Sequence, residues 1–147
     1  MKIRLIALTV LAIAAVVLAA CGPSQSMTTL HVVERATTDT VGDVAPTGDS
    51  VGDVLGFANE VFDAGNTTKV GTDNGMCVRS AVGAAWECIW TLTLADGQIT
   101  VEGPFFDASD STLAITGGTG AYSAAHGEML LHARDATSYD FTYTIYK

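Results

Sequence analysis

The stretch AWECIWTLTLAD, from Ala85 to Asp96, limits what this chain can fold into more than any other part of the sequence. Every second residue of it is an apolar residue or a cysteine, namely Trp86, Cys88, Trp90, Leu92 and Leu94. Successive side chains of a strand point to opposite faces, so this period of two is typical of a β-strand with one buried face.

Short runs of the same kind fill most of the chain. They are rich in Val, Ile, Thr and aromatic residues and are bounded by Gly, Asp, Asn and Ser, which predicts strands separated by turns. We expect these strands over residues 29–36, 53–63, 68–72, 75–82, 85–95, 98–106, 111–116, 127–134 and 138–146. Asp96-Gly97 is a two-residue hairpin signal between two of them.

A set of antiparallel strands of this number forms either a sandwich or a closed barrel. In DVLGFANEVF, one face would carry Leu55, Phe57, Asn59 and Val61, which are apolar apart from one amide. Such a face suits the lumen of a small barrel, so the sequence predicts an all-β, up-and-down antiparallel barrel with a lipocalin-like lumen. A solid core without a cavity remains the alternative.

The N-terminus carries a targeting signal. Lys2 and Arg4 precede an apolar stretch that ends in small residues and Cys21, which is typical of a secretory signal peptide over residues 1–20. The sequence Leu-Ala-Ala-Cys resembles a bacterial lipobox, in which the cysteine becomes the lipidated first residue. An ordinary cleavage site beside an incidental cysteine is the other interpretation. The small residues and the polar GPSQSMTT that follow disfavour a membrane-spanning helix.

Three segments follow from this interpretation: a signal peptide over 1–20, a lipidated cysteine and flexible tether over 21–28, and a barrel domain over 29–147. The expected location is the extracytoplasmic face of the cell membrane, held there by the lipid anchor. The net charge of −9 becomes −11 once Lys2 and Arg4 are removed. The remaining basic residues are scattered, so nucleic acid is excluded as a partner.

Cys77 and Cys88 form an even pair in a chain expected outside the cytoplasm, which predicts a disulfide. The runs MCVRSAV and AAWECIW meet at Val82-Gly83, and a two-residue turn there places the two cysteines opposite each other. Two free buried thiols are the alternative.

The glycine-rich segment LAITGGTGAYSAAHGEM does not bind a nucleotide. Ser123 stands where a dinucleotide fingerprint needs its third glycine, the segment that follows is too short for the required helix, and no P-loop lysine is present. We expect Gly117, Gly118 and Gly120 to serve backbone conformation instead. Ser123 also lacks visible partners for a hydrolase triad.

No metal site or cofactor is predicted. His126 and His132 lack the spacing of metal ligands. The acidic residues between 39 and 53 could hold calcium, but they lack the alternating spacing of a calcium loop, and a solvated acidic loop is the preferred interpretation. They are Asp39, Asp43, Asp49 and Asp53.

Several blocks of the chain resemble plant allene oxide cyclases and, more distantly, dirigent proteins. These are SVGDVLGFANEVFD, KVGTDNGMCV, ITVEGPFF, LAITGGTGAYSAAHGEM and YDFTYTIYK, in the same order and at similar spacing, covering about Ser50 to Tyr146. The resemblance implies an eight-stranded antiparallel barrel with an apolar cavity, often assembled as a homotrimer. It also implies a hydrophobic small-molecule ligand.

Candidate site residues follow from the same resemblance. Asn59 matches the asparagine that holds a water on the substrate oxygen, although a structural hydrogen bond is an equal alternative. His31 and Glu34 are both candidates for the family's catalytic glutamate, and strand parity allows only one of them to face the lumen. Substrate-lining positions are matched by Leu55, Phe57, Cys77 and Trp86, and Phe105 replaces a tyrosine.

These features support two functions. One is an isomerase that cyclises a hydrophobic molecule by steering its conformation. The other is a non-catalytic, dirigent-like barrel that binds or orients such a molecule; a solid structural barrel is a weaker third. Arg79 shares parity with Cys77 and could meet a substrate carboxylate, but the favoured alternative is that it reaches water or pairs with an acid at the barrel rim.

Overall fold

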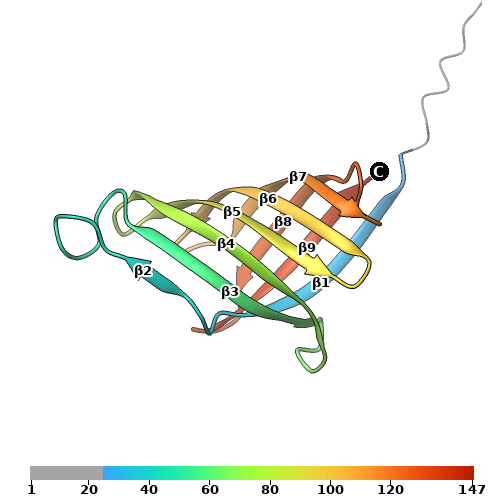
Figure 1. Cartoon of the computed structure of the whole chain (residues 1–147), viewed down its shortest axis with the longest axis horizontal. Helices are drawn as coiled ribbons and strands as arrows, with labels where there is room; N and C mark the ends of the chain where they lie inside the picture. The colour runs from blue at the N-terminus through green and yellow to red at the C-terminus, as the bar shows by residue number, and fades with distance from the viewer. Residues whose placement is uncertain (1–24) are drawn as a thin grey trace, which may run out of the picture.

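The computed structural model describes residues 25–147 and contains strands only (Figure 1). The predicted signal peptide and the predicted lipidation site, Cys21, lie outside the described residues. The strands are β1 (Met27–Arg35), β2 (Thr40–Gly42), β3 (Val54–Asp63), β4 (Lys69–Ala81), β5 (Ala85–Leu94), β6 (Gly97–Phe106), β7 (Ser111–Gly120), β8 (His126–Ala133) and β9 (Ser138–Tyr146). Residues 25–147 include no helix that could cross a membrane.

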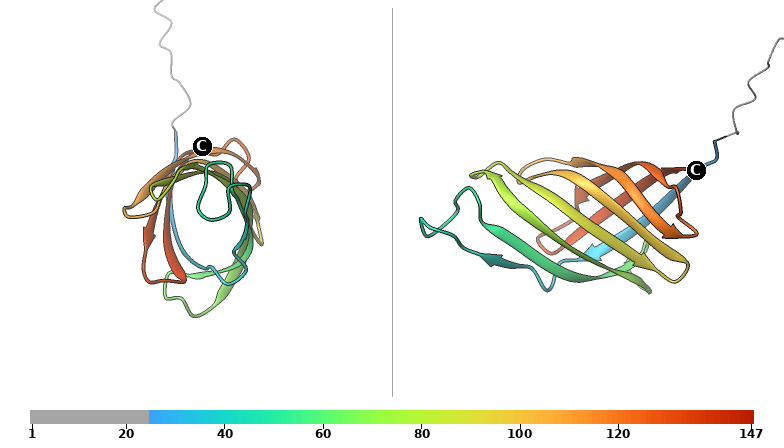
Figure 2. Two further views of the ribbon diagram at one scale, coloured as in Figure 1. Left: turned by 90° about the vertical axis from the view of Figure 1, so that its left-hand side faces the viewer. Right: turned by 45° about the horizontal axis from the view of Figure 1, so that its top comes forward.

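The strands close into an eight-stranded antiparallel barrel, which confirms the predicted fold (Figure 2). Neighbouring strands follow the order β1-β9-β8-β7-β6-β5-β4-β3, and β1 pairs with β3 to close the ring. β2 is an extra short strand on the outer edge of β3. The closing seam between β1 and β3 comprises four residue pairs, from Val32 opposite Asp63 to Arg35 opposite Glu60.

The alternating face of β5 points into the barrel, as predicted. Trp86, Cys88, Trp90 and Leu92 are buried there, whereas Glu87 and Ile89 are exposed on the outer face. Inward residues of the other strands complete one continuous hydrophobic core: Val61, Ile99, Val101, Leu113, Ile115, Met129, Leu131, Phe141, Tyr143 and Ile145.

Two of the predicted strands, 68–72 and 75–82, are one strand in the structure. The sequence TDNG resembles a turn, but β4 runs through it with Asp73 on the lumen face. Gly75 makes this possible because a Cβ at this position would overlap the side chains of Trp90 and Phe57. The glycine therefore makes room for two lumen aromatics.

The glycine-rich segment also continues as a strand, because β7 extends to Gly120 and not to residue 116. Of its glycines, Gly120 has a positive φ of 59°, and Gly118 packs against the carbonyl oxygens of Gln98 and Tyr122. Gly117 shows neither constraint, so its predicted conformational role is wrong. The hairpin before β6 turns at Ala95-Asp96, with Gly97 already in the strand.

Cys77 and Cys88 lie directly opposite each other on β4 and β5 and form a disulfide. The predicted pairing is thus confirmed, but the predicted two-residue turn is wrong. Ala81 pairs with Ala85, so the turn has three residues, and a register shift between Arg79 and Ala81 keeps the two cysteines opposite each other. Both sulfur-bearing side chains face the lumen, so the bridge is part of the inner wall of the barrel.

Candidate functional site

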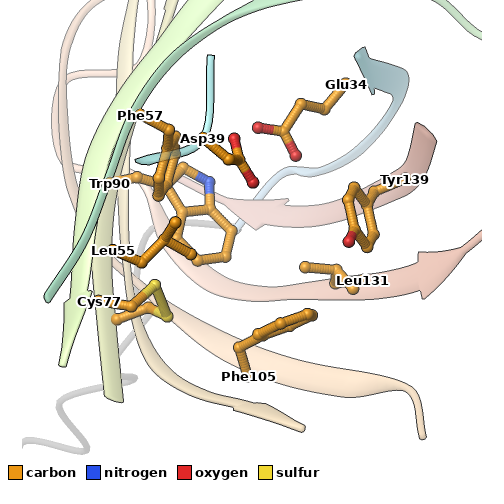
Figure 3. Close-up of a pocket in the computed structure, with 10 residues that line it drawn as sticks. Glu34, Asp39, Leu55, Phe57, Cys77, Trp90, Phe105, Leu131 and Tyr139 are labelled. Carbon is orange, nitrogen blue, oxygen red and sulfur yellow. A yellow bond between two sulfur atoms is a disulfide. The ribbon is translucent and has the colours of Figure 1, made fainter. Parts of the chain in front are cut away.

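A pocket opens at the end of the barrel where β1, β6 and β8 end and β3, β5 and β9 begin (Figure 3). We call it the mouth pocket. Its volume is about 40 Å³, so it takes in one end of a ligand, a polar group with the few carbons beside it, while the rest of the ligand lies at the open mouth. It is lined by Glu34, Asp39, Leu55, Phe57, Cys77, Cys88, Trp90, Phe105, Leu131 and Tyr139.

The lining separates into an apolar part and an acidic part. Leu55, Phe105, Leu131 and the disulfide form apolar walls, whereas the carboxyl groups of Glu34 and Asp39 lie together on the opposite side (Figure 3). Apolar surroundings strengthen any electrostatic interaction that a ligand makes with these carboxyl groups. The pocket can therefore hold the apolar end of a ligand and form a hydrogen bond with one polar atom of it.

Glu34 lies near the end of β1 with its side chain inside the barrel, and 6% of the residue is exposed. Burial raises the pKa of its carboxyl group to about 7, an effect opposed by the hydrogen bond from Asn59 and reinforced by the nearby charge of Asp39. A carboxyl group with such a pKa can give up or accept a proton near neutral pH.

Asn59 is 1% exposed and uses its whole amide to hold this corner of the barrel. Its Nδ2 donates to Glu34 Oε1 and to Asp39 Oδ1, each at 2.7 Å. Its Oδ1 accepts from the backbone N–H groups of Thr37 and Thr38 and from the Thr38 hydroxyl. Asn59 thus fixes the segment after β1 and orients two carboxyl groups.

A third carboxyl group, Asp73 on β4, lies behind Glu34 and is fully buried. It is the cross-strand neighbour of Asn59 and lies within hydrogen-bonding range of Glu34. Burial first, and the charge of Glu34 second, raise the pKa of Asp73 to about 9. The buried hydroxyl of Tyr143 is nearby; burial and the charge of Asp73 raise its pKa well above 10.

The structure places Glu34 in the lumen and His31 outside it, as strand parity requires. The His31 ring is exposed and hydrogen-bonds to the Thr142 hydroxyl at 3.0 Å. His31 therefore has no access to the mouth pocket, and Glu34 remains the candidate from this strand.

Four of the five predicted lining residues are in the pocket, namely Leu55, Phe57, Cys77 and Phe105. Trp86 is on the lumen face but does not line the pocket, because the guanidinium of Arg79 covers its ring at 4.0 Å. Trp90, four residues further along β5 on the same face, lines the pocket instead, and its ring packs against Phe57 and Phe141.

Arg79 is occupied at the rim, as the favoured alternative predicted. It forms ion pairs with Asp49 at 2.6 Å and with Asp107 at 2.7 Å. The two acids come from the loop before β3 and from the turn after β6, so Arg79 ties three segments together beside the mouth. A ligand carboxylate would have to displace both partners.

The sequence reasoning missed Asp73, Tyr139 and Trp90 as site residues and assigned Asp39 to a solvated loop. One feature of the sequence could have indicated Asp73. If the strand runs through TDNG, Asp73 lies on the same face as Cys77 and therefore points into the lumen. Within residues 25–147 no group of histidine, cysteine and acidic side chains is arranged to bind a metal.

Comparisons with known proteins agree with the barrel fold. A family model described as allene oxide cyclase matches residues 25–147. Among solved structures, a pyocyanin demethylase is 23% identical, with a TM-score of 0.71 over 82% of this chain and 100% of that one.

Two further structures share the fold at lower identity. A pterocarpan synthase dirigent protein is 17% identical, with a TM-score of 0.66 over 82% of this chain and 94% of its own. An exo-specific intermolecular Diels–Alderase is 15% identical, with a TM-score of 0.68 over 84% of this chain and 99% of its own. At these identities the likeness concerns the fold.

Proposed function

Because the chain belongs to the allene oxide cyclase family, we propose that it is an isomerase that binds a small hydrophobic molecule in its mouth pocket and rearranges or cyclises it. Structures of similar fold are described as a demethylase, a dirigent protein and a Diels–Alderase, all of which act on small molecules or orient them. One observation carries the proposal most directly: Glu34, a buried carboxyl group whose pKa is raised to about 7, lies beside Asp39 and faces the apolar walls of the mouth pocket.

The geometry suits acid-assisted isomerisation. Leu55, Phe57 and Phe105 would hold the apolar body in one conformation, which lowers the entropy cost of ring closure. Protonated Glu34 would donate its proton to a ligand oxygen, and the carboxylate would take a proton back once the new bond has formed. Donor and acceptor are the same group, so the reaction has no net proton change, as an isomerisation requires.

The full-length protein mixed with a freshly generated C18 allene oxide tests the proposal. Chiral chromatography of the cyclopentenone product should show an excess of one enantiomer over a control without protein, and Glu34→Gln should reduce it. A racemic product formed at the uncatalysed rate, with this substrate and with shorter apolar epoxides, would contradict the proposed activity.

A second candidate is a non-catalytic barrel that binds or orients a hydrophobic ligand. It is favoured by Asn59, whose amide is fully engaged with protein groups, and by Phe105, which leaves this wall of the pocket without a hydroxyl. Saturable quenching of Trp90 fluorescence by an apolar probe, without any conversion of the probe, would support this function over the first.

We also propose that the barrel is tethered outside the cytoplasm through a lipid on Cys21. The proposal rests on the residues before the described part of the chain, where a basic start, an apolar stretch and Leu-Ala-Ala-Cys occur in order. Mass spectrometry of the mature N-terminus should show an acylated Cys21, and Cys21→Ser should release the protein from membranes. An unmodified N-terminus at another residue would contradict it.

A further inference from the structure

Asp73 is a buried acid that the isomerisation scheme above does not use. None of its surface is exposed, and neither carboxyl oxygen accepts a hydrogen bond from an N–H or O–H donor within residues 25–147. The side-chain amide of its cross-strand partner, Asn59 Nδ2, already gives its two hydrogens to Glu34 and Asp39. A buried carboxylate left in this state would be strongly destabilising.

No positive side chain of the described part of the chain compensates these acids. The basic groups are all engaged elsewhere: Arg35 over Phe62, Lys69 with Glu60, Arg79 with Asp49 and Asp107, Arg134 with Asp140, and Lys147 over Tyr122.

The groups that face the carboxyl pair from the packed elements are also acidic or neutral. Asp39 follows β1, Asn59 is on β3, Trp90 is on β5, and Tyr139 and Tyr143 are on β9.

The position of Asp73 next to Glu34 explains how it is accommodated. Two carboxyl groups within hydrogen-bonding range attract each other only when one of them carries a proton, because an ionised carboxylate is an acceptor only. A protonated Asp73 can donate to Glu34, which then receives one hydrogen bond from Asp73 and one from Asn59. The raised pKa values of both acids agree with a proton that stays in the pair at neutral pH.

We propose that Glu34 and Asp73 form a single acid unit in which Asp73 keeps its proton at neutral pH and Glu34 gives up and regains a second one, and that protonated Glu34 selects ligands presenting a neutral oxygen or nitrogen acceptor, not a carboxylate, to the acidic side of the mouth pocket. The ligand part rests on the proposed function. In this unit Asp73 is a positioning residue, because it is sealed behind Glu34 and does not line the pocket.

The proton moves in a balanced way. When Glu34 is protonated, its O–H bond breaks as a new bond forms between the proton and the ligand heteroatom, and the electron pair stays on Glu34. The resulting carboxylate is stabilised by the hydrogen bond from the Asp73 carboxyl group. The ligand later returns a proton to Glu34, and Asp73 keeps its own proton throughout.

This arrangement excludes one class of ligand from the acidic side. A carboxylate placed against Glu34 and Asp39 would meet negative charge in an apolar pocket. A ketone, an epoxide or a ring nitrogen would accept a hydrogen bond there. An acidic group of a ligand is therefore expected to point outward, toward the solvent at the mouth.

Infrared spectroscopy of the full-length protein tests the acid unit without any ligand. At pH 8, the wild type should show the carbonyl band of a buried protonated carboxyl group. The band should remain in Glu34→Gln, vanish in Asp73→Asn, and be unchanged in Asp110→Asn, which alters an exposed acid. Absence of the band at pH 8, or a band that survives Asp73→Asn, would overturn the acid unit.

A second measurement covers the case in which Asp73→Asn fails to fold. Carbon NMR of the wild type, labelled at the carboxyl carbons of aspartate, should show one carboxyl group that stays protonated at pH 8. A spectrum in which every aspartate is ionised at pH 8 would overturn the proposal.

Ligand selection is tested with two probes of the same shape, 2-acetylnaphthalene and 2-naphthoate, by quenching of tryptophan fluorescence. We expect the ketone to bind at least about 10-fold more tightly, with a smaller difference in Glu34→Gln. Equal binding of both probes would overturn the selection while leaving the infrared result standing. If the acid unit is observed but neither probe binds, the pair is real and the proposed binding function fails.

Discussion

Replacing Glu34 by Gln should stabilise the barrel at alkaline pH and leave its stability almost unchanged at acidic pH. The pKa of Glu34 rises from an ordinary value of 4.5 to about 7 in the folded protein, mainly through burial. A group with a raised folded pKa contributes its full stability below the unfolded pKa and loses it as the pH rises through the folded one. The wild type should therefore lose stability between about pH 5 and pH 8 on account of this residue.

The size of the effect follows from the two pKa values. Each pKa unit corresponds to about 1.4 kcal/mol, so the shift of Glu34 amounts to about 3 kcal/mol between the acidic and alkaline limits. Glutamine is close in shape and can still accept the hydrogen bond from Asn59 Nδ2. The variant should thus avoid the cost of ionisation and keep the contact that holds the segment after β1.

Urea unfolding at pH 5, 6, 7 and 8, monitored by tryptophan fluorescence, measures the difference. The free energy of unfolding of Glu34→Gln should exceed that of the wild type by an amount that grows with pH and reaches about 3 kcal/mol at pH 8. Glu102→Gln, on the exposed face of β6, is the matched control and should show no such trend. A gap that stays constant across the four pH values would refute the reasoning.

Three other substitutions test separate parts of the structure. Replacing Cys77 and Cys88 together by alanine should reduce the free energy of unfolding by about 3 kcal/mol, because the unfolded chain regains its freedom; equal midpoints in urea for the variant and the oxidised wild type would contradict this. Gly75→Val should impair folding, because the added side chain overlaps Trp90; its expression as a folded barrel with wild-type near-ultraviolet circular dichroism would show that β4 can shift. Arg79→Leu should leave Asp49 and Asp107 without their cation and loosen the loops that they anchor; faster proteolysis of residues 43–53 is the expected result, and an unchanged cleavage rate would count against the clamp.

The barrel could be predicted because its signal is local and repeated. Trp86, Cys88, Trp90 and Leu92 alternate on one strand, and the same period recurs along the chain. The disulfide followed from two strands that meet at a short turn. Each of these inferences needs only neighbouring residues, and the closed topology did not alter them.

The acidic site could be predicted only in part because it depends on depth and on contacts across the ring. Parity placed Trp86 and Trp90 on the same face but could not tell which of them reaches the pocket, and Arg79 decides this by covering Trp86. Asp73 was hidden in a turn-like TDNG, whose continuity as a strand depends on the space that Gly75 leaves for Trp90. Asp73 lies close to Glu34 only because β1 closes the ring by pairing with β3.

That closure has a consequence for how the molecule opens. The seam between β1 and β3 has four residue pairs, fewer than any other junction of the ring, and Glu34 and Asn59 lie at it. Local opening starts where the fewest interactions must break, so amide hydrogens of residues 32–35 should exchange faster than those in the middle of β5. Because ionisation of the buried acids weakens the same corner, the protection of these amides should fall as the pH rises, beyond the intrinsic acceleration of exchange. Opening of the β1–β3 seam and ionisation of the buried acids are thus expected to be thermodynamically linked.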